Sequence, residues 1–213
     1  MLINASGNTP LTDEEKKRRV KSATKHFGKF MSALGYDWDK DPNSIDTPKR
    51  VAKAYMYDLC SGCFTEPPKV TAFENVDEYD GIVAQCNIPV KSLCCHHFLP
   101  FTGVAHVAYI PNRDGKVIGL SKLNRLTEWI ARRPSVQENL TMQISQQIDE
   151  VCEGNNGVAV VIKARHTCAC LRGVKHDGCY MITSKLTGDF MHDSATRSEF
   201  YKFMEMAANP VQI

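Results

Sequence analysis

Apolar residues in the N-terminal part of the chain recur at the spacing of helices. Thr12 is followed by three acidic residues and then by basic residues, an order that suits the dipole of a helix. Gly35 is a suitable end for that helix. A second helix is predicted from Asp46-Thr47-Pro48 to about Ser61-Gly62. We therefore expect residues 1–68 to form a helical extension.

The pattern changes after Pro67-Pro68, where short apolar runs of strand length replace the helical spacing. Four strands are predicted, at Ile82–Val90, Gly103–Ile110, Val158–Ile162 and Tyr180–Leu186. Between the second and third strands, two segments have helical spacing, at residues 120–130 and 136–151. The order strand, strand, helix, helix, strand, strand predicts an α+β domain over residues 69–213, with helices on one face of an antiparallel sheet.

The last part of the chain predicts one more helix, with Thr196 and Glu199 as a capping box. A small sheet of this kind has two open edges, which proteins cover or pair. Neighbouring copies of the chain could pair with the two edges and close the sheet. In a monomer, loops could cover the edges instead. The pattern alone leaves both arrangements open.

Composition narrows the class of protein. The chain has 213 residues and a net charge of +2, from 26 basic and 24 acidic residues, so charge gives no reason to expect nucleic acid or a membrane as a partner. No apolar run is long enough for a membrane-spanning helix, and the N-terminus does not resemble a secretory signal. Nine cysteines, an odd number, favour a reducing compartment, the cytoplasm, over a disulfide framework.

Two clusters of cysteine and histidine carry the strongest chemical signal. They are Cys94-Cys95-His96-His97 and His166-Thr167-Cys168-Ala169-Cys170, and they flank the predicted helices. Thiolate and imidazole are preferred ligands of zinc, and three such ligands with one open position are typical of a catalytic site. The alternative is a set of buried core residues. Because two clusters occur together, we favour a zinc site.

A second cysteine pair, Cys60-Ser61-Gly62-Cys63, also has spacing that zinc or redox sites use. No second pair of this spacing and no thioredoxin-like pattern accompanies it. We interpret these cysteines as small apolar residues in a turn after a helix.

The segments between the clusters suggest a nucleotide. Ser121 is predicted to cap a helix, and Lys122 and Arg125 are near neighbours on that helix, an arrangement suited to phosphate. A solvated helix face is the alternative. Gln137 and Glu138 begin the next helix. A carboxylate there can accept from both the ring N–H and the amino group of guanine, or simply interact with the helix dipole.

Several of these motifs, in this order, resemble the GTP cyclohydrolase I family. The resemblance runs from about Thr47 to Phe203 and includes Cys94…His96-His97-Phe98, Ala108–Pro111, Ile118–Arg125, Arg133–Glu138 and His166-Thr167-Cys168…Arg172-Gly173. It implies the tunnelling fold, with sheets closed into a barrel in a homodecamer of two stacked pentamers and active sites between subunits. It also implies that GTP and water give formate and 7,8-dihydroneopterin triphosphate.

The resemblance further implies a role for individual residues. Cys94, His97 and Cys168 stand at the zinc positions, and His96 and His166 at the catalytic histidine positions. Ser121, grouped with the catalytic residues, matches a serine beside the triphosphate and ribose. Gln137 and Glu138 stand where the family holds guanine, and the triphosphate positions are Lys122, Arg125, Arg172 and Arg50.

One departure from the family leaves alternatives open. Cys95 stands where the family usually has glutamate, so it could compete for zinc, form a disulfide or alter hydrogen bonding around the ligands. A second reading is a related enzyme on another pterin or deazapurine, such as a nitrile reductase that uses a cysteine nucleophile and NADPH. A third is a non-catalytic, zinc-stabilised scaffold with Cys95 or Cys170 as a fourth ligand.

Overall fold

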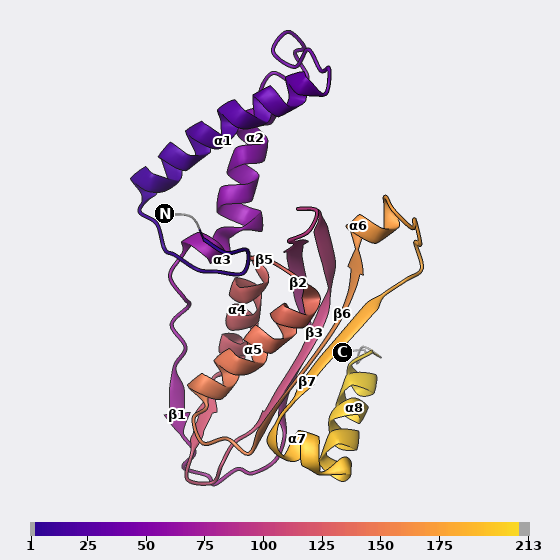
Figure 1. Ribbon diagram of the computed structural model, residues 1–213. Coiled ribbons are helices and arrows are strands. Elements are labelled where there is room, and N and C mark those ends of the chain that lie inside the picture. The colour runs from indigo at the N-terminus through magenta and orange to yellow at the C-terminus, as the bar shows by residue number, and fades with distance from the viewer. Residues whose placement is uncertain (1–2, 209–213) are drawn as a thin grey trace, which may run out of the picture.

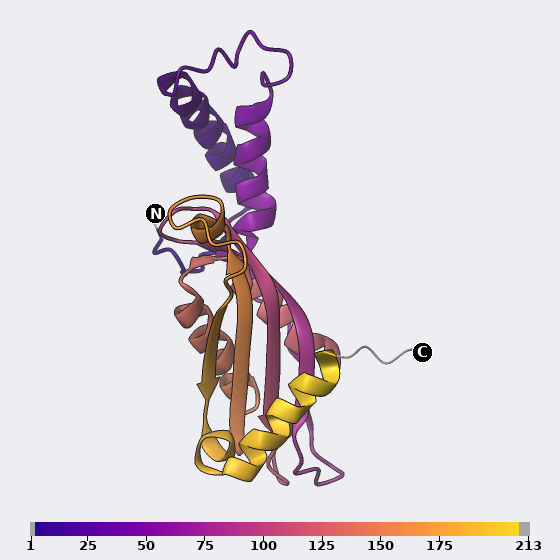
Figure 2. The ribbon, with the colours of Figure 1, turned by 90° about the vertical axis from the view of Figure 1, so that its right-hand side faces the viewer.

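The protein is built around one curved, mixed sheet. The structure, a computed structural model, describes residues 3–208. The sheet has five strands in the order β5-β2-β3-β6-β7 (Figures 1 and 2). Their bounds are β2 Val83–Cys94, β3 Pro100–Ile110, β5 Pro134–Ser135, β6 Gly157–His166 and β7 Met181–Leu186. A separate antiparallel pair joins β1 (Ala72–Glu74) to β4 (Lys116–Ile118).

Helices cover both faces of this sheet. Alternate residues of β3 point to opposite sides, so Val107 and Tyr109 pack against α4 (Leu120–Ala131) and α5 (Gln137–Val151). Ala108 and Ile110 pack instead with Phe190 of α7 (Gly188–His192) and Phe200 of α8 (Ser194–Ala208). The predicted order of two strands, two helices and two strands is confirmed. Helices α7 and α8 lie on the opposite face from α4 and α5. The sequence had predicted helices on one face only.

The helices of residues 13–64 form an N-terminal arm above the sheet (Figure 1). Helix α1 (Asp13–Ala33) begins with a capping box between Thr12 and Glu15, and the chain leaves it at Gly35, whose φ is +91°. Its 21 residues make it the longest helix within residues 3–208. Neither it nor any other helix within residues 3–208 is long and apolar enough to cross a lipid bilayer.

The predicted second helix is divided into three pieces. Helix α2 (Thr47–Ala54) continues into a π-helical turn, η1 (Tyr55–Leu59), and then into α3 (Ser61–Phe64). The π-helical turn closes with the Cys60 N–H donating to the Tyr55 carbonyl at 2.9 Å, five residues back.

Helix α3 is anchored on the end of α4 by a close backbone contact. The Gly62 N–H donates to the Arg132 carbonyl at 3.0 Å, and a Cβ at Gly62 would lie 2.0 Å from the Trp129 carbonyl oxygen. Only glycine fits there. The buried Arg133 guanidinium donates to the Gly62 carbonyl at 3.2 Å and lies 3.8 Å from the centre of the Trp129 ring. These contacts fix the arm relative to the sheet.

Two predicted helix starts are wrong. Helix α8 begins at Ser194, because the Asp193 carboxylate accepts from the Ala195 and Thr196 N–H groups at 2.9 and 3.2 Å. Asp193 thus performs the capping role that was assigned to Thr196 and Glu199. Helix α4 has Gly119 as its N-cap, without a side-chain cap, so the exposed Ser121 lies within the first turn.

The sheet of a single chain stays open at both sides. Among residues 3–208, β7 pairs with β6 only, and the outer side of β2 is paired with β5 over just Leu93 and Cys94. Tyr180 and Ile182, beside and within β7, are 58 % and 63 % exposed. Unpaired strand edges of this length are usually covered by another element or another chain.

Candidate active site

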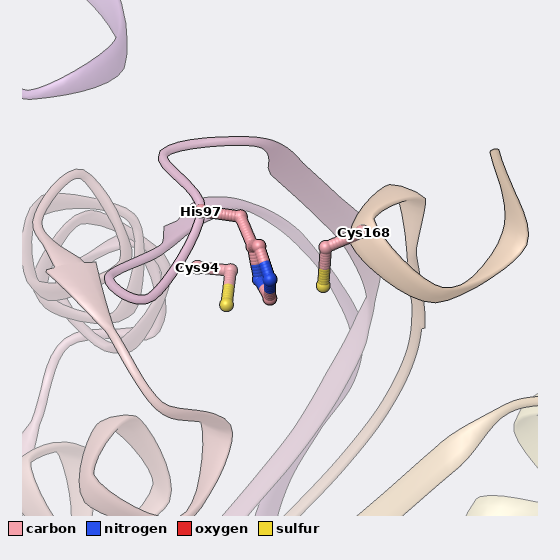
Figure 3. Close-up of side chains that lie close together, drawn as sticks. All are labelled: Cys94, His97 and Cys168. Carbon is pink, nitrogen blue, oxygen red and sulfur yellow. The ribbon is translucent and has the colours of Figure 1, made fainter. Parts of the chain in front are cut away.

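The two cysteine and histidine clusters meet at one end of the sheet. Cys94 ends β2, His97 lies in the turn to β3, and Cys168 lies on α6 (Thr167–Cys170), directly after β6. One ligand atom from each residue lies within 4.8 Å of the other two. Figure 3 shows the two sulfur atoms on either side of the His97 imidazole. The pairing of β3 with β6 brings these distant segments together, since Phe101 lies opposite His166.

A tight turn presents the first cluster. The Phe98 N–H donates to the Cys94 carbonyl at 2.8 Å, and the Cys94 N–H donates to the Leu99 carbonyl at 2.9 Å. Phe98 adopts a φ of +54°, a left-handed conformation that costs a non-glycine residue about 1 kcal/mol. The turn leaves His96 and His97 exposed beside the buried Cys94.

The donor set fits a zinc ion. Burial raises the pKa of the Cys168 thiol, and the neighbouring Cys94 raises this pKa further, while Arg172 lowers it. Metal binding to the Cys168 thiol therefore has to release its proton. Within residues 3–208, no fourth histidine, cysteine or acidic side chain joins the group. The Cys170 thiol donates to the His166 carbonyl at 3.1 Å, and Cys95 lies outside the group, so neither forms a four-ligand structural site.

His166 lies beside this group in a fixed orientation. Its ring stacks on the buried Phe101 ring, with 4.3 Å between the ring centres and an angle of 11° between the planes. Burial lowers the pKa of His166, and the nearby Glu138 raises it in part. Because the net shift is downward, the imidazole is neutral near pH 7.

Gln137 determines which nitrogen of His166 carries the proton. The Gln137 amide nitrogen donates to the Ile162 and Met181 carbonyl oxygens, each at 3.1 Å. This leaves the Gln137 carbonyl oxygen facing His166 Nε2 at 2.8 Å, where it can only accept. Neutral His166 is therefore protonated at Nε2 and has a free lone pair at Nδ1. Gln137, only 1 % exposed, has its amide engaged by the protein.

A cavity of about 390 Å³ opens beside the two clusters. Predicted site residues that line it are Cys94, His96, His97, Gln137, Glu138, His166 and Cys168. The loop after α6 forms another wall of the cavity through His176, Cys179 and Tyr180, none of which the sequence had predicted as a site residue. Asp177 pairs with Arg165 at 2.9 Å and Lys163 lies over the Tyr180 ring at 4.8 Å, so β6 holds this loop.

Other predicted site residues lie away from this cavity in a single chain. Ser121, Lys122 and Arg125 lie in the first half of α4, whose 12 residues span about 18 Å. The last turn of α4 precedes β5, which pairs with β2 next to Cys94, so the first turn points to the far end of the sheet. Arg50, on α2, pairs with Asp46 at 3.5 Å. Arg172 alone among the predicted phosphate contacts lies near Cys168.

The cysteine pair in the arm has a packing role. Cys60 and Cys63 are buried with Leu93, and burial raises the pKa of their thiols to about 12 and about 11. Such thiols are protonated at neutral pH and are poor nucleophiles.

We expect thiol reactivity to follow these environments. In the folded protein at pH 8, iodoacetamide should label the exposed Cys179 first and leave Cys60, Cys63 and Cys152 unlabelled, because they are buried and burial raises the pKa of the last to about 12. Peptide mass spectrometry over time measures this order, and denatured protein serves as the control. Early labelling of Cys60 would contradict the buried environment described above.

Comparison with known proteins agrees with these features. The family model of GTP cyclohydrolase I matches residues 23–205. A Pseudomonas syringae protein named GTP cyclohydrolase 1 2 is 44 % identical over 182 residues, which cover 84 % of this chain and 97 % of that protein. A Thermoanaerobacter pseudethanolicus protein named GTP cyclohydrolase 1 is 41 % identical over 185 residues, which cover 86 % and 94 %.

Proposed function

Because the chain belongs to the GTP cyclohydrolase I family, we propose that the cavity beside Cys94, His97 and Cys168 is where it opens the guanine imidazole ring of GTP. The products are formate and 7,8-dihydroneopterin triphosphate. The observation that carries this proposal is the trio of metal-ligating side chains within 4.8 Å of one another, next to a cavity lined by His166 and Glu138. The unbonded cysteines suit a reducing compartment such as the cytoplasm.

Cys94, His97 and Cys168 would hold zinc in this proposal. When bound, zinc acts as a Lewis acid that lowers the pKa of water toward neutrality, which favours addition of water to C8 of the purine. The three side chains leave room for this chemistry, since no fourth protein ligand within residues 3–208 joins them.

His166 moves the proton that ring opening requires. Its Nε2–H is held by Gln137, so Nδ1 is the atom that accepts a proton as water adds. The same nitrogen then returns the proton to the ring nitrogen that leaves C8. The lowered pKa of His166 keeps Nδ1 free near pH 7, as a base requires. His96, exposed in the same cavity, is the second proposed proton carrier.

Glu138 selects guanine. It lies in the first turn of α5 and lines the cavity with an exposed carboxylate. That carboxylate can accept from N1–H and from the 2-amino group together, a pattern that adenine lacks. Gln137 contributes indirectly, by orienting His166, because its amide is engaged by the protein.

A complete substrate site would form between two copies of the chain. The cations at the start of α4 lie far from the cavity of their own chain, whereas the open edges of β2 and β7 allow sheets of neighbouring copies to join. In this arrangement Ser121, Lys122 and Arg125 of one copy face the cavity of the next copy. They hold the triphosphate together with Arg172 of the copy that contains the cavity. Arg50 on the arm is a further candidate. A decamer of two stacked pentamers is the assembly that we propose.

Turnover of GTP and ITP tests both the reaction and the role of Glu138. Zinc-loaded protein should release formate from GTP and produce the absorbance of the dihydropterin. Without the 2-amino group, ITP should react at least about tenfold less well. Glu138→Gln should lower kcat/KM for GTP by about tenfold to a hundredfold, because the amide offers one acceptor where two are needed. It should also lose the preference for GTP over ITP.

Glu150→Gln is the matched control, since Glu150 is exposed at the other end of the same helix. It should retain the wild-type kcat/KM for both nucleotides. Zinc-loaded wild-type protein that releases no formate from GTP would refute the proposed reaction. A Glu138→Gln variant that keeps its preference for GTP would refute only the recognition of guanine.

A further inference from the structure

A tyrosine of the N-terminal arm contacts the turn that carries the metal ligand His97. The Tyr55 hydroxyl donates to the Phe98 carbonyl oxygen at 2.9 Å. The two rings stack, with 5.8 Å between their centres and an angle of 5° between their planes. Phe98 directly follows His97, and its left-handed φ closes the turn. Tyr55 therefore holds the one residue of the turn whose backbone is least favourable.

The position of Tyr55 is itself fixed by the π-helical turn. Tyr55 begins η1, and one extra residue in this turn shifts the side chains that follow relative to an α-helix. Tyr55 and Leu59 pack on a buried cluster of Cys60, Cys63 and Leu93, and Leu93 precedes Cys94 on β2. The close contact of Gly62 with Trp129 anchors the end of this segment on α4. The packing of this segment therefore fixes the position from which Tyr55 contacts the turn.

We propose that Tyr55 is a positioning residue that holds the Cys94–Phe98 turn in its metal-binding conformation and so couples the N-terminal arm to the metal site. This inference rests on the proposed metal site. Tyr55 is neither one of the three donors nor one of the residues that line the cavity, and it donates to the Phe98 carbonyl, so it acts through the backbone of Phe98. Without its hydrogen bond, the turn would sample conformations in which His97 is displaced from Cys94 and Cys168, and each binding event would first have to restore the turn.

Tyr55→Phe tests this role, because it keeps the stacked ring and removes only the hydroxyl. The zinc dissociation constant, measured by competition with a chromophoric chelator and without GTP, should rise about fivefold, the effect of one ordinary hydrogen bond. The visible absorption of the cobalt-loaded protein, which reports ligand geometry, should shift. At saturating zinc, kcat should fall while KM for GTP stays the same, because Glu138 lies outside the turn.

Tyr57→Phe is the matched control, on the same π-helical turn. Tyr57 is 44 % exposed, and its hydroxyl makes no hydrogen bond within residues 3–208. It should bind zinc like the wild type. Tyr55→Leu, which also removes the stacked ring, should weaken zinc binding more than Tyr55→Phe does. The melting temperature of the metal-free protein should be the same for wild type, Tyr55→Phe and Tyr57→Phe.

Equal zinc affinity in Tyr55→Phe and Tyr57→Phe would overturn the inference. So would a loss of zinc affinity in Tyr55→Phe that is matched by a fall in the melting temperature of the metal-free protein, because the tyrosine would then act on the whole fold. Both measurements are independent of GTP. A protein that binds zinc as expected but does not turn over GTP would refute the proposed reaction and leave the role of Tyr55 standing.

Discussion

His166→Ala should lower GTP turnover by about a thousandfold, within the usual range for loss of a general acid–base group, and leave zinc bound. The variant removes the Nδ1 lone pair of an imidazole that lines the cavity and is oriented by Gln137 and by stacking on Phe101. It removes none of the three metal-ligating side chains. Formate release measures turnover, and elemental analysis measures the zinc content, which should remain one ion per chain.

His176→Ala is the control for this variant. His176 lines the same cavity from the exposed loop after α6, and no proton transfer is assigned to it. Its turnover should stay close to that of the wild type, because no step of the proposed mechanism uses its side chain. If His166→Ala retained a tenth or more of the wild-type turnover, His166 would not be the proton carrier. Loss of zinc from His166→Ala would mean that its effect is on the metal site instead.

Removal of the metal should abolish turnover to a similar degree. Wild-type protein treated with a chelator should lose at least about a thousandfold of its activity, because several kcal/mol of transition-state stabilisation depend on the ion. Added zinc should restore the activity. Cys168→Ala should be inactive and should not respond to zinc, since it lacks one of the three donors.

Cys170→Ala provides the comparison within the same short helix. The Cys170 thiol donates to a backbone carbonyl and lies outside the donor group, so this variant should keep its zinc and most of its activity.

Zinc affinity of the wild type should rise with pH through the neutral range. Burial and Cys94 raise the pKa of Cys168, so protons compete with the metal up to a higher pH than for an ordinary thiol. Turnover that survives complete metal removal would refute this account.

The sequence left two alternative functions open, a related enzyme with a cysteine nucleophile and a non-catalytic zinc scaffold. Membership of the GTP cyclohydrolase I family and the intact trio of donors argue against a cysteine nucleophile that works with NADPH. A zinc scaffold would need a fourth ligand from Cys95 or Cys170, and neither joins the donor group. Zinc binding without turnover of GTP would support the scaffold hypothesis.

The order of the central elements and the two clusters that supply the donors could be read from the sequence, for physical reasons. The choice of Cys94, His97 and Cys168 within those clusters came from the resemblance to a family. Apolar periodicity distinguishes strands from helices, and the ligands occur in two short clusters that the sheet pairs directly. The inward turn of Gln137 could not be read in this way. Its partners, the Ile162 and Met181 carbonyls, belong to strands whose approach to α5 depends on tertiary packing. The π-helical turn at Tyr55 depends likewise on packing around Gly62.

The start of α4 shows a different limit. Serine is a frequent cap, but Gly119 takes the extended conformation one residue before the helix and leaves Ser121 inside it. Capping preferences locate a helix end to within one or two residues, which is too coarse to say which groups face a phosphate. Within one chain, Lys122 and Arg125 lie away from the cavity. The proposal that a second copy brings them to a cavity depends on the geometry of assembly, which a single sequence does not contain.

The pairing of Phe101 with His166 has a consequence for how the chain folds. Side chains alternate between the two faces of a strand, so a slip of β6 by one residue against β3 would turn His166 to the opposite face and carry Cys168 away from Cys94. Only the correct alignment assembles the three donors. Zinc available during folding would therefore favour the native alignment over its neighbours by mass action, and folding without zinc should yield more misaligned, aggregation-prone chains.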